Sequence, residues 1–226
     1  MIRKYVFGKP FETEAVTTEI PVTAGVPGYG RTELEDGFSF TMDMKKQDVV
    51  YGLGENIRGI NKRGYLYISN ASDDPHHTED KSSLYAAHNF LIVAGEQNVG
   101  FFFDYPAAME FDVGYTDLDI LRVSCREADL VLYVIEGDSP YDITKQFRKI
   151  IGRSYIPPKF AFGFGQSRWG YKTQEDFFQV ADGYRKNHLP LDMIYMDIDY
   201  MQDYKDFTFN EEHFSDFPEF VAKMKE

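Results

Sequence analysis

Apolar and polar residues alternate along much of the first 137 residues, with the two-residue period of a strand that is buried on one face. The clearest case is residues 38–44, which read Phe-Ser-Phe-Thr-Met-Asp-Met. Similar stretches are short, rich in Phe, Val, Ile and Tyr, and separated by Gly, Asn, Asp or Pro. Many short strands at even spacing are typical of an antiparallel β-sandwich. The strands predicted by this pattern are residues 38–44, 65–69, 90–94, 99–104, 109–113, 118–125 and 130–136.

A helical pattern replaces the alternation after Gly137. Ser139 is a good N-cap residue and Pro140 suits the first helical position. Apolar side chains then recur on one helical face, and Gly152 is a natural helix end. The apolar residues of that face are Ile143, Phe147, Ile150 and Ile151.

Two adjacent prolines, Pro157 and Pro158, follow this helix. Because proline cannot continue a helix and stiffens the chain, we interpret them as the mark of a domain boundary. We therefore expect an N-terminal β-sandwich domain at residues 1–155 and a second domain at residues 156–226.

The second domain shows the order strand, helix, strand, helix. Residues 160–166 and 193–199 are the predicted strands, a capping box at Thr173 opens the helix between them, and residues 214–219 open another helix. This alternation indicates the first βαβα units of a (β/α)8 TIM barrel. A closed barrel takes about 250 residues, and only 70 residues follow residue 156. The alternatives are a small open sheet or the front part of a longer protein, and the helix in which the chain ends favours the longer protein.

The chain is acidic, with 24 Lys and Arg side chains against 37 Asp and Glu and a formal net charge of −13. This charge disfavours nucleic acids and anionic membranes as partners, since both select Lys and Arg. Cys125 is the single cysteine, which excludes an internal disulfide and is typical of a reducing compartment. No apolar run approaches the roughly 18–20 residues of a membrane span, and the first residues lack the apolar segment of a signal peptide. We therefore expect a soluble, cytoplasmic protein.

Polar and aromatic side chains follow both predicted strands of the second domain, at the end where βα barrels place their sites. Trp169, the only tryptophan, can offer a flat face to a sugar ring or can pack beneath a loop. Asp197 and Asp199 would point to one side of an ideal strand. Such a pair suits the acid and nucleophile of a retaining glycosidase, an Asp-x-Asp site for a hard cation, or a cap on the next loop. The residues alone leave these alternatives open.

Two other motifs carry less chemistry. His76 and His77 are adjacent, so they cannot easily chelate one metal ion, and no third ligand stands at a suitable spacing. We expect a solvated loop there. Gly52 and Gly54 resemble half of a dinucleotide-binding loop, but no helix follows them, and glycines of a strand or bulge are the better interpretation.

Several motifs occur in one order along nearly the whole chain. The first three are Tyr-Gly-Leu-Gly-Glu at residues 51–55, Pro-Pro-Lys at 157–159 and Gly-Phe-Gly-Gln-Ser-Arg-Trp-Gly-Tyr at 163–171. The others are the segment 190–201, which begins Pro-Leu-Asp, then Asp-Phe-Thr-Phe at 206–209 and Phe-Pro at 217–218. In these motifs the chain resembles the N-terminal portion of glycoside hydrolase family 31, the α-glucosidase family. They match, in order, a signature of its N-terminal β-sandwich, its linker and first barrel strand, and its second strand with the following loop. One departure is Asn89, where the family usually has proline.

The resemblance implies a retaining α-glycosidase. The family nucleophile is an aspartate in a Trp-x-Asp-Met-Asn-Glu motif, and the family acid/base is a later aspartate. This chain lacks the motif, so both catalytic residues are expected beyond Glu226. Asp197 matches the aspartate that holds sugar hydroxyls in the −1 subsite, and Ile198 matches its apolar neighbour. Trp169 matches a variable aromatic residue of that subsite, and Asp73 matches a loop aspartate that reaches the +1 sugar.

Asp74 is the adjacent alternative to Asp73 in this alignment. The function that the resemblance implies is release of glucose from nonreducing ends of α-linked gluco-oligosaccharides, with no metal or cofactor, in a protein of which this chain alone is inactive. One rival is a noncatalytic carbohydrate-binding β-sandwich. Another is an Asp-x-Asp metal-dependent transferase, but residues 1–137 do not supply the nucleotide-binding sheet that it needs ahead of Asp197.

Overall fold

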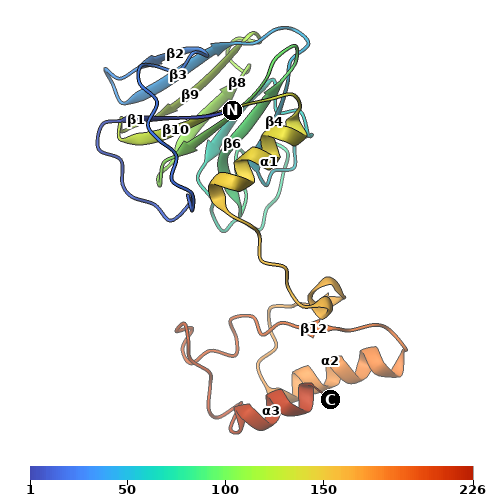
Figure 1. The fold of residues 1–226 in the computed structure, drawn as a ribbon. Helices are drawn as coiled ribbons and strands as arrows, with labels where there is room; N and C mark the ends of the chain where they lie inside the picture. The colour runs from blue at the N-terminus through green and yellow to red at the C-terminus, as the bar shows by residue number, and fades with distance from the viewer. Residues whose placement is uncertain (226) are drawn as a thin grey trace. The chain divides into compact units, whose positions relative to one another are not determined.

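The computed structural model describes residues 1–225 and divides the chain into two compact units, Met1–Arg153 and Ser154–Glu226 (Figure 1). Each unit has a hydrophobic core of its own. None of the helices in the described residues has the length and the apolar character needed to cross a bilayer.

The N-terminal unit is built from two five-stranded antiparallel sheets within the described residues (Figure 1). The first sheet has the strand order β1-β10-β7-β6-β4 and the second has the order β2-β3-β9-β8-β5. The strands of the first sheet are β1 (Ile2–Phe7), β10 (Leu130–Gly137), β7 (Asn98–Asp104), β6 (Ala87–Ala94) and β4 (Val49–Gly54). The strands of the second sheet are β2 (Arg31–Glu33), β3 (Phe38–Asp43), β9 (Ile120–Cys125), β8 (Met109–Val113) and β5 (Tyr65–Ser69).

The core of this unit lies between the two sheets and consists largely of aromatic rings. Phe40, Phe101, Phe103 and Phe111 are fully buried. The Phe40 and Phe101 rings of opposing sheets lie 5.0 Å apart, and those of Phe103 and Phe111 lie 5.8 Å apart. Along β3 the side chains of Phe38 and Phe40 are buried and that of Met42 on the same face is partly buried, as the alternating pattern predicts. The predicted antiparallel sandwich is therefore confirmed.

Helix α1 (Pro140–Ile151) covers the outer face of the first sheet (Figure 1). Ser139 caps it, since its hydroxyl accepts the backbone N–H three residues ahead at 3.2 Å. Ile143 is fully buried beneath the helix, and Phe147 stacks on Phe90 of the sheet with ring centroids 3.8 Å apart. The predicted helix is confirmed, including its cap.

The sequence pattern missed three strands. β1 pairs with β10 over six residues at the edge of its sheet, and its alternation is obscured by Arg3 and Lys4. β2 has only three residues and pairs with β3. The remaining one, β4, contains the Gly52 and Gly54 pair. At their ends the predicted strands differ by a few residues: β6 begins at Ala87, and β9 begins at Ile120.

A bulge interrupts β4. The register with β6 shifts between Gly52 and Gly54, and Gly52, Leu53 and Gly54 all have positive φ. A Cβ atom at Gly52 would lie 2.3 Å from the carbonyl oxygen of Phe90, so only glycine fits there. The interpretation of these residues as bulge glycines is confirmed.

The C-terminal unit contains two short parallel strands, β11 (Gly165–Gln166) and β12 (Met193–Ile194). A 3₁₀ turn, η1 (Lys159–Phe162), precedes them, and the helices are α2 (Gln174–Lys186) and α3 (Phe217–Met224). The unit's core is an aromatic cluster of Tyr171, Phe177, Phe214 and Phe220.

The lengths predicted for the two parallel strands were wrong. Residues 160–162 form the 3₁₀ turn instead, closed by a hydrogen bond from the N–H of Gly163 to the carbonyl of Phe160. β12 ends at Ile194 and is half-buried, so Asp197 and Asp199 do not lie on a strand. The physical reason is that each strand pairs with a single neighbour in the described residues, and strand length depends on pairing.

The two strands are joined at their beginning by a side chain. The carboxylate of Asp192 accepts the N–H of Phe164 at 3.0 Å, and the N–H of Asp192 donates to the carbonyl of Phe164 at 2.9 Å. A Cβ atom at Gly163 would lie 2.2 Å from the Asp192 carboxylate, so glycine is required for this approach. The contact fixes the register in which β11 and β12 present the residues that follow them.

The helix expected from residue 214 begins later. Asp216 caps α3, accepting the N–H of Glu219 at 3.0 Å, and Phe214 is buried in the aromatic cluster ahead of the helix. The capping box of α2 is as the sequence predicts. Thr173 accepts the N–H of Asp176 at 3.3 Å, and the Asp176 carboxylate accepts the N–H of Thr173 at 2.9 Å.

Replacing Thr173 with alanine should destabilise α2 by about 0.5–2 kcal/mol, the usual loss on removing an N-cap side chain. Ser139→Ala is the matched control, because it removes the equivalent cap from α1 in the other unit. Hydrogen exchange should be faster in the first turn of α2 for Thr173→Ala and in that of α1 for Ser139→Ala. Unchanged exchange in α2 after Thr173→Ala would contradict the role of the box.

Candidate functional site

Gln166 ends β11 and is held by two tyrosines. Its side-chain oxygen accepts the hydroxyl of Tyr184 at 2.5 Å, and its side-chain nitrogen donates to the hydroxyl of Tyr171 at 3.0 Å. Tyr184 belongs to α2 and Tyr171 to the aromatic cluster. The end of β11 is therefore tied to the body of the unit, which gives the residues beyond it a defined starting point.

Trp169 lies three residues beyond β11, in a turn that Gly170 completes with a φ of 109°. Its side chain is 69% exposed. Within residues 1–225, no loop covers the indole. The ring face is free to receive an apolar surface, and the indole N–H is free to donate a hydrogen bond.

Asp197 and Asp199 follow β12 but have different partners. Asp197 is half-buried, and its carboxylate accepts the N–H of Ile198 at 2.8 Å. The Asp199 carboxylate accepts the hydroxyl of Tyr204 at 3.2 Å, and this bond raises the pKa of Tyr204. The expectation that both carboxylates share one strand face is wrong, because the strand ends before them. Asp199 holds its own loop, whereas Asp197 has oxygen lone pairs available beyond its contact with Ile198.

Ile198 is 43% exposed and begins a turn, since its carbonyl accepts the N–H of Met201 at 3.2 Å. The loop that follows has three non-glycine residues with positive φ, namely Asp203, Tyr204 and Phe207. Backbone of this kind persists only where surrounding contacts fix it. Such contacts are present here, because Thr208 accepts the N–H of Gln202 at 3.0 Å and donates to the carbonyl of Lys205 at 2.6 Å.

Asp73 belongs to the N-terminal unit, in the loop between β5 and β6. Its carboxylate is exposed and accepts the hydroxyl of Tyr85, which raises the pKa of Tyr85. The neighbouring Asp74 is engaged differently. Hydrogen bonds from the ammonium of Lys81 and from the N–H of His76 hold the pKa of Asp74 below its usual value. Asp74 therefore closes the loop on itself, and Asp73 is the aspartate left facing solvent.

Tyr85 is the residue beside Asp73 that sequence reasoning missed. Its ring packs edge-on against His77 with centroids 5.3 Å apart, so His77 has a packing partner in the loop. No spacing rule joins Asp73 to a tyrosine 12 residues later, because the contact exists only once the loop folds back. Within residues 1–225, no group of three or more His, Cys, Asp or Glu side chains is arranged to hold a metal ion.

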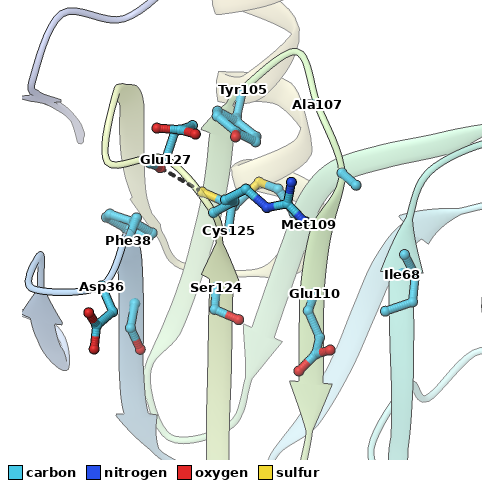
Figure 2. Close-up of a pocket in the computed structure, with 13 residues that line it drawn as sticks. Asp36, Phe38, Ile68, Tyr105, Ala107, Met109, Glu110, Ser124, Cys125 and Glu127 are labelled. Carbon is cyan, nitrogen blue, oxygen red and sulfur yellow. Dashed lines mark hydrogen bonds between the residues drawn. The ribbon is translucent and has the colours of Figure 1, made fainter.

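A cavity of about 690 Å³ lies on the N-terminal unit (Figure 2). The residues that line it include Tyr105, Met109, Cys125 and Glu127 (Figure 2). The thiol of Cys125 donates to the carbonyl of Glu127 at 3.2 Å, and burial raises the pKa of Cys125 to about 11. The thiol is therefore protonated near neutral pH and is not a nucleophile. None of the site residues expected from the sequence lines this cavity.

Comparison with known protein families matches both units. Residues 9–112 match the N-terminal galactose mutarotase-like domain of glycosyl hydrolase family 31, and residues 154–226 match the TIM-barrel domain of the same family. The chain therefore belongs to glycoside hydrolase family 31. Its fold is the N-terminal sandwich of that family followed by the start of the barrel, so the predicted fold class is confirmed.

Individual relatives agree with this assignment. The chain is 32% identical over 207 residues to alpha-glucosidase 2 of Bacillus thermoamyloliquefaciens, a match that covers 91% of this chain and 26% of the relative. It is 26% identical over 216 residues to an alpha-glucosidase of Saccharolobus solfataricus, covering 92% of this chain and 31% of that protein. The chain thus spans about a quarter to a third of the length of these relatives.

A solved structure with a similar fold is the family 31 dextranase of Flavobacterium johnsoniae, in complex with isomaltotriose. The identity is 25% and the TM-score is 0.78, over 86% of this chain and 24% of that chain.

Proposed function

We propose that this protein is an α-glucosidase-type retaining glycoside hydrolase that releases glucose from the nonreducing ends of α-linked oligosaccharides. The observation that carries the proposal is that exposed Trp169 and half-buried Asp197 follow the two paired strands of a family 31 barrel. Relatives named as alpha-glucosidases and a dextranase structure that holds isomaltotriose support the choice of α-linked glucose as the substrate.

Asp197 has the chemistry to bind the nonreducing sugar of the −1 subsite. An ionised carboxylate accepts hydrogen bonds only, so it pairs with sugar hydroxyls as donors. Exposed Ile198 supplies an apolar contact beside it, and the indole of Trp169 supplies a wall against the C–H face of the ring. None of the three is assigned a proton transfer or a nucleophilic step.

Asp73 is the proposed contact for the sugar in the +1 subsite. Asp74, its neighbour, is the less favoured choice because Lys81 and His76 already bond to its carboxylate. Releasing Asp74 to a sugar would break a charge-assisted hydrogen bond within the loop. Asp73 needs no such release, since its partner Tyr85 occupies only part of its acceptor capacity.

The reaction would proceed in two displacements. A carboxylate nucleophile forms a bond to the anomeric carbon while the glycosidic C–O bond breaks and a carboxylic acid donates its proton to the departing oxygen. Water then attacks the anomeric carbon, the acid residue now accepting a proton from that water, and the glycosyl–carboxylate bond breaks. Both carboxyl groups are expected in parts of the family that residues 1–226 do not match, and the reaction as proposed needs no cofactor or metal.

The 226-residue chain by itself should show no turnover of an aryl α-glucoside, because the residues assigned here bind sugar and do not react. The measurement is release of the aryl alcohol over background with the isolated chain. Asp197→Asn and Asp199→Asn versions serve as controls. Robust hydrolysis that either substitution abolishes would show that these two aspartates are the catalytic pair and would overturn the proposal.

A further inference from the structure

Arg58 makes an unusual set of contacts for a side chain with no role in the proposed reaction. Its guanidinium donates to three backbone carbonyls, those of Leu66 and Glu79 at 2.8 Å each and that of Asp80 at 3.2 Å. It also lies over the ring of Tyr65 at 4.5 Å and that of Tyr67 at 5.0 Å. Leu66 and both tyrosines belong to β5, whereas Glu79 and Asp80 belong to the loop that carries Asp73.

These contacts join the loop of residues 70–83 to the sheet. The planar guanidinium has donors pointing in fixed directions, so it bonds to the strand and to the loop at the same time. Within residues 1–225, no other side chain from outside residues 66–85 forms a hydrogen bond with this loop. The backbone adds a bond to the sheet, from the N–H of Ile68 in β5 to the carbonyl of Ser82 at 3.3 Å. The main side-chain bond within the loop is the Lys81 contact with Asp74.

The turn that presents Arg58 is itself held in place. Lys62 is buried, and its ammonium donates to the side chain of Asn56 at 2.7 Å and to the carbonyl of Gly59 at 2.9 Å. Burial, together with the nearby charge of Arg58, lowers the pKa of Lys62. Asn61 closes the other side of the turn by accepting the N–H of Val50 at 3.1 Å. Arg58 therefore projects from a fixed turn to a loop with few other anchors.

We propose that Arg58 is a positioning residue that clamps the β5–β6 loop to the sheet and thereby fixes the place of Asp73 for the sugar in the +1 subsite. The inference rests on the proposed function for the role of Asp73. It adds a residue that touches no substrate. Loss of the clamp should weaken recognition of a second sugar while leaving the chemistry at the first sugar unchanged.

Arg63 provides a matched control. It lies on the same turn and also donates to backbone carbonyls, those of Leu118 at 2.9 and 2.7 Å and of Asp48 at 3.2 Å. Its partners are loops that do not carry Asp73. Arg63 also donates to the carbonyl of Lys45 and pairs with the carboxylate of Asp119 at 2.8 Å. Arg58→Met and Arg63→Met therefore each remove a guanidinium from one turn, and only the first removes contacts with residues 79 and 80.

The first measurement uses the 226-residue chain and follows hydrogen exchange in residues 70–83. Arg58→Met should speed exchange there, Arg63→Met should not, and Arg58→Lys should be intermediate because an ammonium keeps the charge without the planar fork. Equal exchange of this loop in the wild type and Arg58→Met would overturn the proposal. If Arg58→Met does not fold, exchange of this loop is compared between the wild type and Arg58→Lys instead.

The second measurement uses the full-length protein and compares an α-linked glucose disaccharide with α-glucosyl fluoride, which has no second sugar. For Arg58→Met we expect kcat/KM on the disaccharide to fall about three- to tenfold through KM, the range for loss of an ordinary hydrogen bond. The fluoride should stay within twofold, and Arg63→Met should leave the ratio of the two substrates unchanged. Equal losses on both substrates in Arg58→Met would overturn the positioning role. If the wild type hydrolyses neither substrate, the proposed function is overturned, and so is the inferred effect of Arg58 on binding of the second sugar. The hydrogen-exchange measurement would then still decide whether Arg58 holds the loop.

Discussion

Asp197→Ala in the full-length protein is expected to lower kcat/KM on an α-linked glucose disaccharide by about 10–150-fold, which corresponds to the roughly 1.5–3 kcal/mol of a hydrogen bond to a charged group. The carboxylate is half-buried and follows β12, where it is proposed to accept hydroxyls of the nonreducing sugar. If these hydrogen bonds tighten as charge develops on the ring, the loss will fall on kcat as well as on KM.

Asp199→Ala is the matched control for this prediction, because it removes the same group two residues further along the loop. The Asp199 carboxylate has a local partner in the hydroxyl of Tyr204 and no proposed contact with sugar. Its loss should change kcat/KM only a few-fold. Small and equal effects of the two substitutions would remove Asp197 from the proposed site.

Asp197→Asn separates the charge of the side chain from its size. The amide keeps one oxygen acceptor and replaces the other with a donor. We expect kcat/KM to fall between the values of the wild type and Asp197→Ala. An asparagine variant as active as the wild type would show that the negative charge is not needed and would weaken the proposed role.

The sequence predicts elements well where they are fixed by neighbours in the chain. The α2 capping box depends on Thr173 and Asp176, which are three residues apart, and both of its hydrogen bonds are present. The apolar face of α1 and the alternation of β3 are likewise local patterns, and both elements are where the pattern places them.

Prediction fails where an element depends on partners that are distant in sequence. The strand predicted at residues 193–199 has seven residues, yet pairing supports only Met193–Ile194. β1 is a strand because β10, about 130 residues later, hydrogen-bonds to it along its whole length. Neither outcome is encoded in a local window, because the free energy of a strand comes largely from its neighbours.

The candidate site shows the same division. Asp73, Trp169, Asp197 and Ile198 could be proposed from motifs, but the contacts that distinguish them could not. Asp73 differs from Asp74 because Lys81 pairs with only one of them. The contact of Arg58 with residues 79 and 80 joins positions about 20 residues apart through a fold-dependent approach. Because these contacts differ from residue to residue, they assign each motif residue a separate role that can be tested.

Trp169→Tyr is expected to change which linkage is preferred more than whether the reaction runs. The indole is 69% exposed beyond β11 and supplies neither a nucleophile nor a catalytic proton in the proposed reaction. Tyrosine keeps an aromatic face but has less volume and a polar group at a different position. Rearranged contacts with one hydroxyl or methylene typically change discrimination by about 10–200-fold. The ratio of kcat/KM on α-1,4- and α-1,6-linked glucose disaccharides should therefore change.

The melting temperature measured on the same variant separates this role from a structural one. The ring is exposed within residues 1–225 and contributes little packing there, so the melting temperature of the 226-residue Trp169→Tyr chain should change little. Tyr141→Ala is the control, since Tyr141 is 80% exposed on α1 of the other unit and has no proposed contact with sugar. It should alter neither quantity. A large drop in melting temperature with an unchanged linkage ratio in Trp169→Tyr would mean that the tryptophan supports the fold. A changed ratio at constant melting temperature is the result expected of a side chain that forms a wall of the sugar subsite.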